Sequence, residues 1–95
     1  MRIAGIIWLR DVVDKLDWKH NVTTDEVEEV LKRRPRFRLI EKGNVQGEHL
    51  YVGMGQTEAG RYLAVYFVYK KTGEALIVTA RTMTEKERKS YAKKP

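Results

Sequence analysis

Residues 62–80 read YLAVYFVYKKTGEALIVTA, and this stretch decides the fold. Its first part, Tyr62 to Tyr69, is apolar at every position, as is typical of a central strand that is covered on both faces. Lys71-Thr72-Gly73 then supplies the short glycine-containing connection of a β-hairpin, and Leu76 to Ala80 forms the returning strand. The stretch therefore predicts an antiparallel pair at the middle of a sheet.

The residues before this hairpin extend the sheet. Leu50 to Gly55 alternates large apolar residues with a tyrosine and glycines, and Thr57-Glu58-Ala59-Gly60 separates it from the central strand as a turn. Phe37 to Glu41 alternates basic and apolar residues and is a candidate edge strand, which a partner strand could extend. We therefore predict an antiparallel meander of about four strands.

The N-terminal residues predict a strand and a helix. Ile3 to Leu9 is short and mostly apolar, which favours a first strand. Asp11 is the candidate cap of a helix that runs to about His20, and Asn21 suits a left-handed stop. Three aromatic residues are predicted to lie in the core: Trp8, Trp18 and Phe67.

Two capping boxes mark further helices. Thr23 and Glu26 begin one that ends before Pro35, and Thr84 and Glu87 begin a C-terminal one that runs to about residue 93. The first of these should turn three acidic residues to solvent: Asp25, Glu28 and Glu29. The order is strand, two helices, meander and C-terminal helix, which is an α+β fold with helices packed on one sheet face.

The composition limits the classes of protein that need considering. The chain has 95 residues, which fits a single domain over 1–95, and 42% of them are apolar. It contains no cysteine, which excludes disulfides, a thiolate nucleophile and cysteine zinc sites. The longest apolar run is too short to cross a bilayer, and the first residues are too short for a signal peptide. We therefore expect a soluble, cytoplasmic protein with no membrane partner.

The net charge of +6 is unevenly distributed. Lys32 to Lys42 carries six basic residues and one acidic residue, and Arg81 to Pro95 carries six basic and two acidic residues. If the two segments lie side by side, they form an anion-binding face that suits phosphate backbones. The alternative is that these charges only keep the protein soluble.

The remaining side chains favour one kind of chemistry. No metal-ligand spacing, nucleophile elbow, P-loop or dinucleotide motif is present, and no cofactor is expected. Lys, Arg, His, Tyr and Glu remain, and they suit cleavage of RNA without a metal. RNA brings its own nucleophile, the 2′-hydroxyl, so the protein has only to orient it, move protons and neutralise charge.

Candidate residues for this chemistry lie near helix and strand ends. Lys15 and Lys19 are four residues apart on the first helix, and His20 follows as either a partly buried helix-end histidine or a proton-transfer group. Arg81 lies where the last strand ends, a position from which a rigid sheet can direct a side chain into a cleft.

Arg88 and Tyr91 lie three residues apart on the C-terminal helix and so share one face. That spacing is compatible with a structural stack of the two side chains or with a catalytic pair.

Three stretches together resemble the BrnT family of type II toxin–antitoxin ribonucleases. They are residues 19–30 (KHNVTTDEVEEV), 55–63 (GQTEAGRYL) and 79–91 (TARTMTEKERKSY). The ending A-R-x-M-x-x-x-E-R-x-x-Y is fairly specific, and the resemblance runs from about Trp8 to Tyr91. It implies a RelE-like fold, metal-independent endoribonuclease activity that blocks translation, and inhibition by a cognate, BrnA-like antitoxin. It further implies that operator DNA is bound only through the antitoxin in the complex.

The resemblance implies six functional residues: Lys19, His20, Arg61, Arg81, Arg88 and Tyr91. The chemistry of these side chains suggests what each would do. Arg81 and Arg88 would bind the scissile phosphate, because a guanidinium matches phosphate oxygens. His20 would move protons, Lys19 would assist electrostatically, and Tyr91 would stack on a base or hydrogen-bond the phosphate. The remaining RNA-binding candidates are Lys15, Arg36, Arg38, Arg61 and Lys89.

Two positions depart from the family pattern, since Leu50 and Ala75 stand where relatives often have basic residues. Arg36 and Arg38 are the candidates to replace them. The alternative function is a nucleic-acid-binding or antitoxin-docking relative that has lost cleavage.

Overall fold

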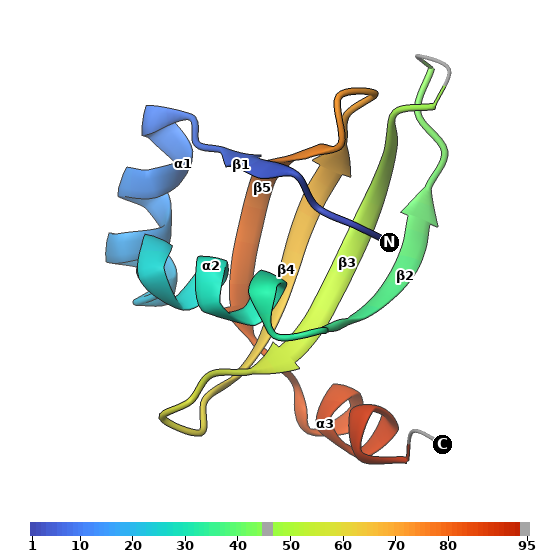
Figure 1. Ribbon diagram of the computed structural model, residues 1–95. Helices are drawn as coiled ribbons and strands as arrows, with labels where there is room; N and C mark the ends of the chain where they lie inside the picture. Colours follow the sequence, from blue (N-terminus) through green and yellow to red (C-terminus); the bar gives the residue numbers. More distant parts are fainter. Residues whose placement is uncertain (45–46, 94–95) are drawn as a thin grey trace.

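The computed structural model describes residues 1–44 and 47–93 of the chain (Figure 1). One mixed sheet with the strand order β1-β5-β4-β3-β2 forms its centre. The strands are β1 (Gly5–Ile7), β2 (Arg36–Glu41), β3 (His49–Gln56), β4 (Tyr62–Tyr69) and β5 (Glu74–Thr82). The helices are α1 (Arg10–Lys15), the π-helical turn η1 (Leu16–His20), α2 (Thr24–Lys32) and α3 (Glu85–Ala92). The predicted α+β class is confirmed.

The central position predicted for β4 is also confirmed. It pairs antiparallel with β3 along its whole length and with β5 on its other side. Leu63, Val65 and Phe67 point to one face and are fully buried, and Ala64 is fully buried on the other. Ala64 is covered by the side chains of Val52, Met54 and Met83 and not by a helix, and burial on both sides explains why apolar residues occupy successive positions here.

The N-terminal strand gives the sheet a fifth member that the meander prediction did not include. β1 pairs parallel with β5, with Gly5 opposite Glu74 and Ile7 opposite Leu76. The Ala4 N–H also donates to the Gly73 carbonyl at 2.8 Å, which continues this pairing to the β4–β5 turn. The sheet is therefore mixed, and β2 is its free edge on the opposite side, as expected for residues 37–41.

The main core lies between the sheet and the first three helical segments. The buried residues of these segments are Leu16 of η1, Val22 of the connection, and Val27, Val30 and Leu31 of α2. A Cβ added at Gly53 would lie 3.1 Å from Leu31 Cδ2, and one at Gly55 would lie 3.1 Å from Val30 Cγ1. The glycines of β3 therefore let α2 pack directly on the strand.

Both capping boxes are confirmed. The Thr23 and Thr84 side chains each accept a hydrogen bond from the backbone N–H three residues further along the chain. In turn, the Glu26 and Glu87 carboxylates accept from the backbone N–H groups of Thr23 and Thr84. The predicted cap at Asp11 is wrong. Leu9 is the N-cap of α1 and makes no side-chain capping bond, so Asp11 lies inside the first turn.

The first helical segment ends differently from a regular α-helix. Its last turn, η1, is a π-helix, and Asn21 ends it with a φ of 52°, so the predicted left-handed stop is confirmed. Trp18 was predicted to lie in the core and is instead 74% exposed. Trp18 lies two residues after the buried Leu16, on the opposite side of this helical segment, so its side chain faces solvent.

The core positions predicted for Phe67 and Trp8 agree better with the structure. Phe67 is fully buried. Trp8 is half-buried, and its indole Nε1–H donates to Glu28 Oε2 at 3.1 Å. Glu28 therefore does not simply face solvent as predicted, and neither does Glu29, which is half-buried, whereas Asp25 is exposed.

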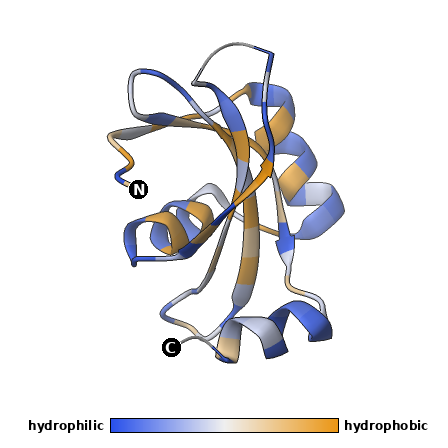
Figure 2. Ribbon diagram, turned by 90° about the vertical axis from the view of Figure 1, so that its right-hand side faces the viewer, coloured by the Kyte–Doolittle hydropathy of each residue, from blue (hydrophilic) through white to orange (hydrophobic). Residues whose placement is uncertain are grey.

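The prediction that all helices pack on one face is wrong for α3. This helix lies at the end of the sheet where β5 finishes, near the C-terminus in two views (Figures 1 and 2). A second cluster of buried residues lies on the face opposite to α2 and consists of Val52, Met54, Ala64 and Met83. Tyr91 of α3 packs against this cluster. Most of this second face is left open by the helices.

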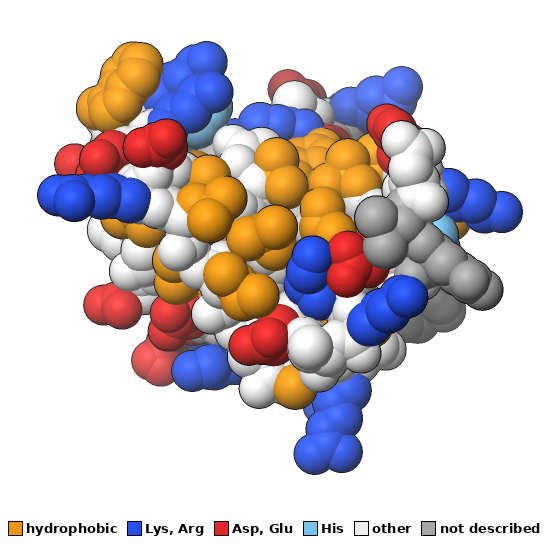
Figure 3. All heavy atoms as spheres, turned by 90° about the horizontal axis from the view of Figure 1, so that it is seen from above, with side chains coloured by type: hydrophobic (Ala, Val, Ile, Leu, Met, Phe, Trp, Pro, Cys, Tyr) orange, Lys and Arg blue, Asp and Glu red, His pale blue; other side chains and the backbone are white. Residues whose placement is uncertain are grey.

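Seen from the end that carries β1, hydrophobic side chains occupy the centre of the surface and charged side chains surround them (Figure 3). Within the described part of the chain, no helix is long and apolar enough to cross a membrane.

Candidate nucleic-acid interface

Three of the predicted arginines are directed to the open face of the sheet by strand pairing. Arg36 and Arg38 of β2 stand opposite Met54 and Val52 of β3, and Arg81 of β5 stands opposite Ala64 of β4. Paired residues in a sheet direct their side chains to the same face, and Val52, Met54 and Ala64 belong to the second, smaller core cluster. The open face is therefore basic.

Arg81 is held by a carboxylate and a tyrosine. Its guanidinium donates to the two oxygens of Glu87 at 2.7 and 2.9 Å and to Tyr66 Oη at 2.9 Å. The Glu87 contact raises the pKa of Arg81, and Arg81 in turn lowers the pKa of Glu87 to about 2. Both groups therefore stay charged at neutral pH, and Glu87 is a poor proton acceptor.

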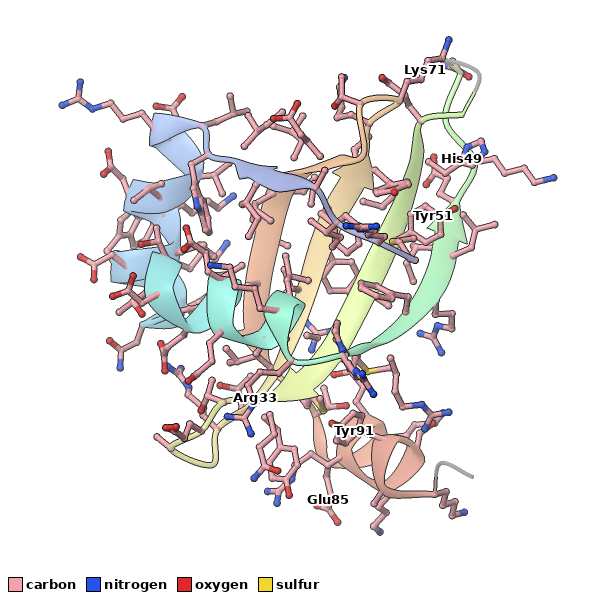
Figure 4. All side chains as sticks on the ribbon, in the orientation of Figure 1. Arg33, His49, Tyr51, Lys71, Glu85 and Tyr91 are labelled. Carbon is pink, nitrogen blue, oxygen red and sulfur yellow. The ribbon has the colours of Figure 1, made fainter. Side chains whose placement is uncertain are left out.

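Arg88 lies on the face of an aromatic ring. Its guanidinium carbon is 4.2 Å from the centroid of the Tyr62 ring, which is cation–π geometry. Tyr91 contacts the same ring edge-to-face at 6.1 Å, so Arg88 and Tyr91 both meet Tyr62. In Figure 4, Tyr91 lies on α3 just below the ends of the strands, and Glu85 lies further out on the same helix.

We call Tyr62, Tyr66, Arg81, Arg88 and Tyr91 the arginine–tyrosine cluster. A hollow of about 500 Å³ opens beside it, lined by Tyr62, Met83, Glu85, Arg88, Lys89 and Ala92. Lys89 forms an exposed ion pair with Glu85 at 3.4 Å. The hollow thus combines cationic groups with an aromatic ring, and proteins bind single-stranded nucleic acids with this combination of side chains.

Arg36 connects the two basic segments of the sequence. Its Nη1 donates to the carbonyls of Ser90 and Tyr91 at 3.3 and 3.2 Å. The start of Lys32–Lys42 therefore lies against the end of α3, so the basic segments meet at this point. The last two residues of the second segment, Lys94 and Pro95, lie outside the described residues.

Arg61 has a different environment from the other arginines. Its Nη1 donates to Asn21 O at 2.6 Å and to Glu26 Oε1 at 3.0 Å, and its Nη2 donates to His20 O at 3.3 Å. A longer contact of 3.4 Å reaches Thr82 Oγ1. Arg61 therefore ties the end of η1 and the start of α2 to the end of β5.

The Arg61 contacts also act on the Glu26 carboxyl. Partial burial works to raise the pKa of Glu26, but hydrogen bonds from the Thr23 backbone and from Arg61 outweigh it, so this pKa is lowered. The Arg61 guanidinium is thus used mainly inside the protein, and its predicted role in RNA binding stays a prediction.

Lys19 and His20 lie at the end of η1. Lys19 is exposed and His20 half-buried, and Arg61 holds the His20 carbonyl beside Thr82, the residue after Arg81. Among the described residues, no hydrogen bond joins either side chain to the arginine–tyrosine cluster. Lys15 is exposed at the end of α1. The structure therefore groups Arg36, Arg81, Arg88, Lys89 and Tyr91, and leaves Lys15, Lys19 and His20 on α1 and η1.

Sequence reasoning missed Tyr62, Tyr66 and the partner role of Glu87. The only sequence signal for Glu87 was its capping box, which concerns the helix and not Arg81. Tyr62 and Tyr66 belong to an apolar run, and only the strand pairing reveals that they face Arg81 and α3. Over the residues that the structure describes, no three His, Asp or Glu side chains gather as a metal site.

Comparison with known proteins gives no assignment. No family model matches the sequence, and no curated protein matches it.

Proposed function

We propose that this chain is the ribonuclease toxin of a type II toxin–antitoxin system, with a RelE-like arrangement similar to that of BrnT proteins. The observation that carries the proposal is the arginine–tyrosine cluster on an open sheet face. Guanidinium groups bind phosphate, and tyrosine rings stack on bases, so the cluster suits a single-stranded RNA. The sequence resemblance supports the choice of a toxin among the RNA-binding classes.

The reaction needs no group beyond the protein and the RNA. The 2′-oxygen attacks the adjacent phosphorus and loses its proton, the bond to the 5′-oxygen breaks, and that oxygen gains a proton. The products are a 2′,3′-cyclic phosphate and a 5′-hydroxyl end. Arg81 and Arg88 would stabilise the charge that develops on the phosphoryl oxygens. His20 is the proton-transfer candidate, because the two ring nitrogens of an imidazole can accept and donate a proton.

The resting site contains a competitor for the substrate. Glu87 neutralises Arg81 through two short hydrogen bonds. A phosphate that binds Arg81 therefore has to share the guanidinium with Glu87 or displace the Glu87 carboxylate. Arg88 and Arg38 have no carboxylate partner among the described residues and are exposed. We assign the first contact with RNA to these two residues, and Arg81 then joins Arg88 in stabilising the transition state.

Incubation of the purified protein with total RNA in EDTA tests the proposal. We expect the wild type to degrade RNA and Arg88→Ala to lose about 100-fold or more in rate, as is typical when one stabilising donor is removed. Lys86→Ala is the matched control, since Lys86 is exposed on the same helix and lies outside the hollow. Equal rates for the two variants would refute the role of Arg88.

A second function is favoured by the separation of His20 from the cluster and by the neutralisation of Arg81. Both are compatible with a protein that binds RNA, or docks an antitoxin, without cleaving. In that case the same incubation leaves RNA intact, while binding of a labelled oligonucleotide still weakens steeply with salt. The two functions therefore differ in the appearance of cyclic-phosphate ends.

The proposal includes a protein partner. A cognate, BrnA-like antitoxin would cover the basic face with an acidic surface, and operator DNA would be bound through the antitoxin only. Co-expression with the antitoxin encoded beside the gene would then restore growth and protect RNA, and Arg38→Glu would weaken this protection.

A further inference from the structure

A second concave surface lies on the opposite face of the sheet, away from the arginine–tyrosine cluster. It has a volume of about 600 Å³, within the range of about 300–1,000 Å³ that is usual for small-molecule sites. Three segments form its walls: the N-terminal residues 1–6, the end of α2 and the connection from α2 to β2. We call it the N-terminal groove. The Tyr69 hydroxyl donates to the Arg2 carbonyl at 2.5 Å and holds the N-terminal wall in place.

The floor of the N-terminal groove is apolar and contains an aromatic ring. Ile3, Ile6, Leu31, Pro35 and Phe37 line it. The Phe37 ring is fixed by an edge-to-face contact with the buried Phe67 at 5.8 Å. A rigid ring beside aliphatic groups can accept a flat aromatic ligand such as a nucleobase.

The rim is cationic. Arg2, Lys32 and Arg34 line the groove and are exposed, and Glu28 is its only carboxylate. Within the described part of the chain, none of the three cationic side chains has an acidic partner, while Glu28 accepts from the Trp8 indole. These donors suit a phosphate ligand better than a carboxylate ligand, because a phosphate has more acceptor oxygens.

Arg34 occupies a backbone position that does not favour arginine. Its φ is 55°, directly after the end of α2, where glycine is usual, and it precedes Pro35, which further disfavours this conformation. An arginine there is less favourable for the fold than glycine. Such a cost at an exposed residue is consistent with a function for the guanidinium itself.

We propose that the N-terminal groove binds a nucleoside monophosphate unit. Its phosphate contacts Arg34, Lys32 and Arg2, and its base packs on Phe37 and Leu31. The Glu28 carboxylate, on the groove wall, suits an exocyclic amino group of the base, which adenine, cytosine and guanine carry and uracil lacks. This site is separate from the arginine–tyrosine cluster and does not depend on RNA cleavage.

Titration of the ¹⁵N-labelled full chain with 5′-AMP, followed by amide chemical shifts, tests the proposal. We expect shifts at residues 2–6, 28 and 31–37 and not at residues 81–91. A short RNA oligonucleotide ending in a 5′-phosphate forms the second arm and reports whether the unit is free or part of a strand. Dodecanoate forms the third arm. Shifts from dodecanoate alone, or from 5′-AMP only near α3, would overturn the proposal.

Two variants separate binding from folding. Arg34→Gly should stabilise the fold, because glycine suits the positive φ, and should weaken 5′-AMP binding about tenfold. Arg33→Ala is the matched control, since Arg33 neighbours the groove without lining it and its loss removes the same charge. Equal weakening by Arg33→Ala would mean non-specific attraction and refute the site. RNA cleavage by Arg34→Gly reports on the proposed function independently.

Discussion

The Arg81–Glu87 pair gives the most quantitative test of the structure. Glu87 has a pKa of about 2 in the folded protein against an ordinary value of 4.5, because Arg81 donates to both of its oxygens. Since a lowered folded-state pKa favours the folded state only while the carboxylate is charged, the stabilisation is present above about pH 4.5. It is lost as the pH falls towards 2.

The size of the effect follows from these two pKa values. At about 1.4 kcal/mol per pH unit, the difference between 4.5 and about 2 gives an upper limit of about 3 kcal/mol near neutral pH. About 1 kcal/mol of this remains at pH 2.5, where the pair is still partly ionised. The Arg81 and Glu87 side chains are 33% and 20% exposed, so solvent screening will reduce the limit somewhat.

Urea unfolding of the wild type and Glu87→Gln at pH 7 and pH 2.5 measures this contribution. Glutamine keeps an oxygen for the Thr84 capping bond, so the variant removes mainly the charge. We expect it to lose about 2 kcal/mol more at pH 7 than at pH 2.5. Glu85→Gln, in an exposed carboxylate of the same helix, should change by less than about 0.5 kcal/mol at both values. An equal loss at both pH values in Glu87→Gln would refute the reasoning.

Four further predictions concern the site and the core. Glu87→Gln also releases Arg81, so it should bind a single-stranded RNA oligonucleotide several-fold more tightly at low salt; unchanged affinity in a filter-binding assay would remove Arg81 from the interface. Phe67→Ala should lower the free energy of unfolding by about 3–5 kcal/mol, because the ring is fully buried. Gly43→Ala should cost about 1–3 kcal/mol in the same assay, since its Cβ would lie 2.0 Å from a backbone carbonyl oxygen; a neutral result would contradict the loop geometry. Arg61→Lys should cost about 1–3 kcal/mol, because a lysine cannot bridge the same acceptors, and a stability equal to the wild type would show that the bridge is dispensable.

The features that could be predicted from sequence are those with local causes. The two T-x-x-E capping boxes concern groups three residues apart, and both formed as expected. The apolar run of β4 follows from burial of both its faces, and Asn21 tolerates the left-handed conformation that ends η1. In each case the residues that determine the structure are close together in the chain.

The features that were missed depend on contacts between distant residues. β1 lies parallel to β5, almost 70 residues away, and three residues carry too little pattern to reveal such a pairing. Trp18 was assigned to the core on its apolar character, but it lies on the side of the helical segment opposite to the buried Leu16 and is exposed. The contact of Arg81 with Tyr66 needs the register of β4 and β5, which includes a bulge between Tyr66 and Phe67.

The partners of the arginines separate structural from binding roles. Arg61 and Arg36 donate to carbonyls of the protein and hold η1 and α3 in place. Arg81 is shared, because Glu87 keeps it charged and positioned but also competes with any phosphate. Arg38 and Arg88 are exposed, and neither has a carboxylate partner among the described residues.

Loss of Arg38 should therefore weaken RNA binding without lowering stability, and loss of Arg88 should lower stability only by its contact with the Tyr62 ring, about 0.5–1 kcal/mol, whereas loss of Arg61 should lower stability first. Charge patterning in the sequence could locate these arginines but could not rank them. The ranking depends on which acceptors the fold places beside each guanidinium. It also predicts that the slope of log K against log salt for RNA binding becomes shallower by about one in Arg88→Ala and does not change in Arg61→Ala.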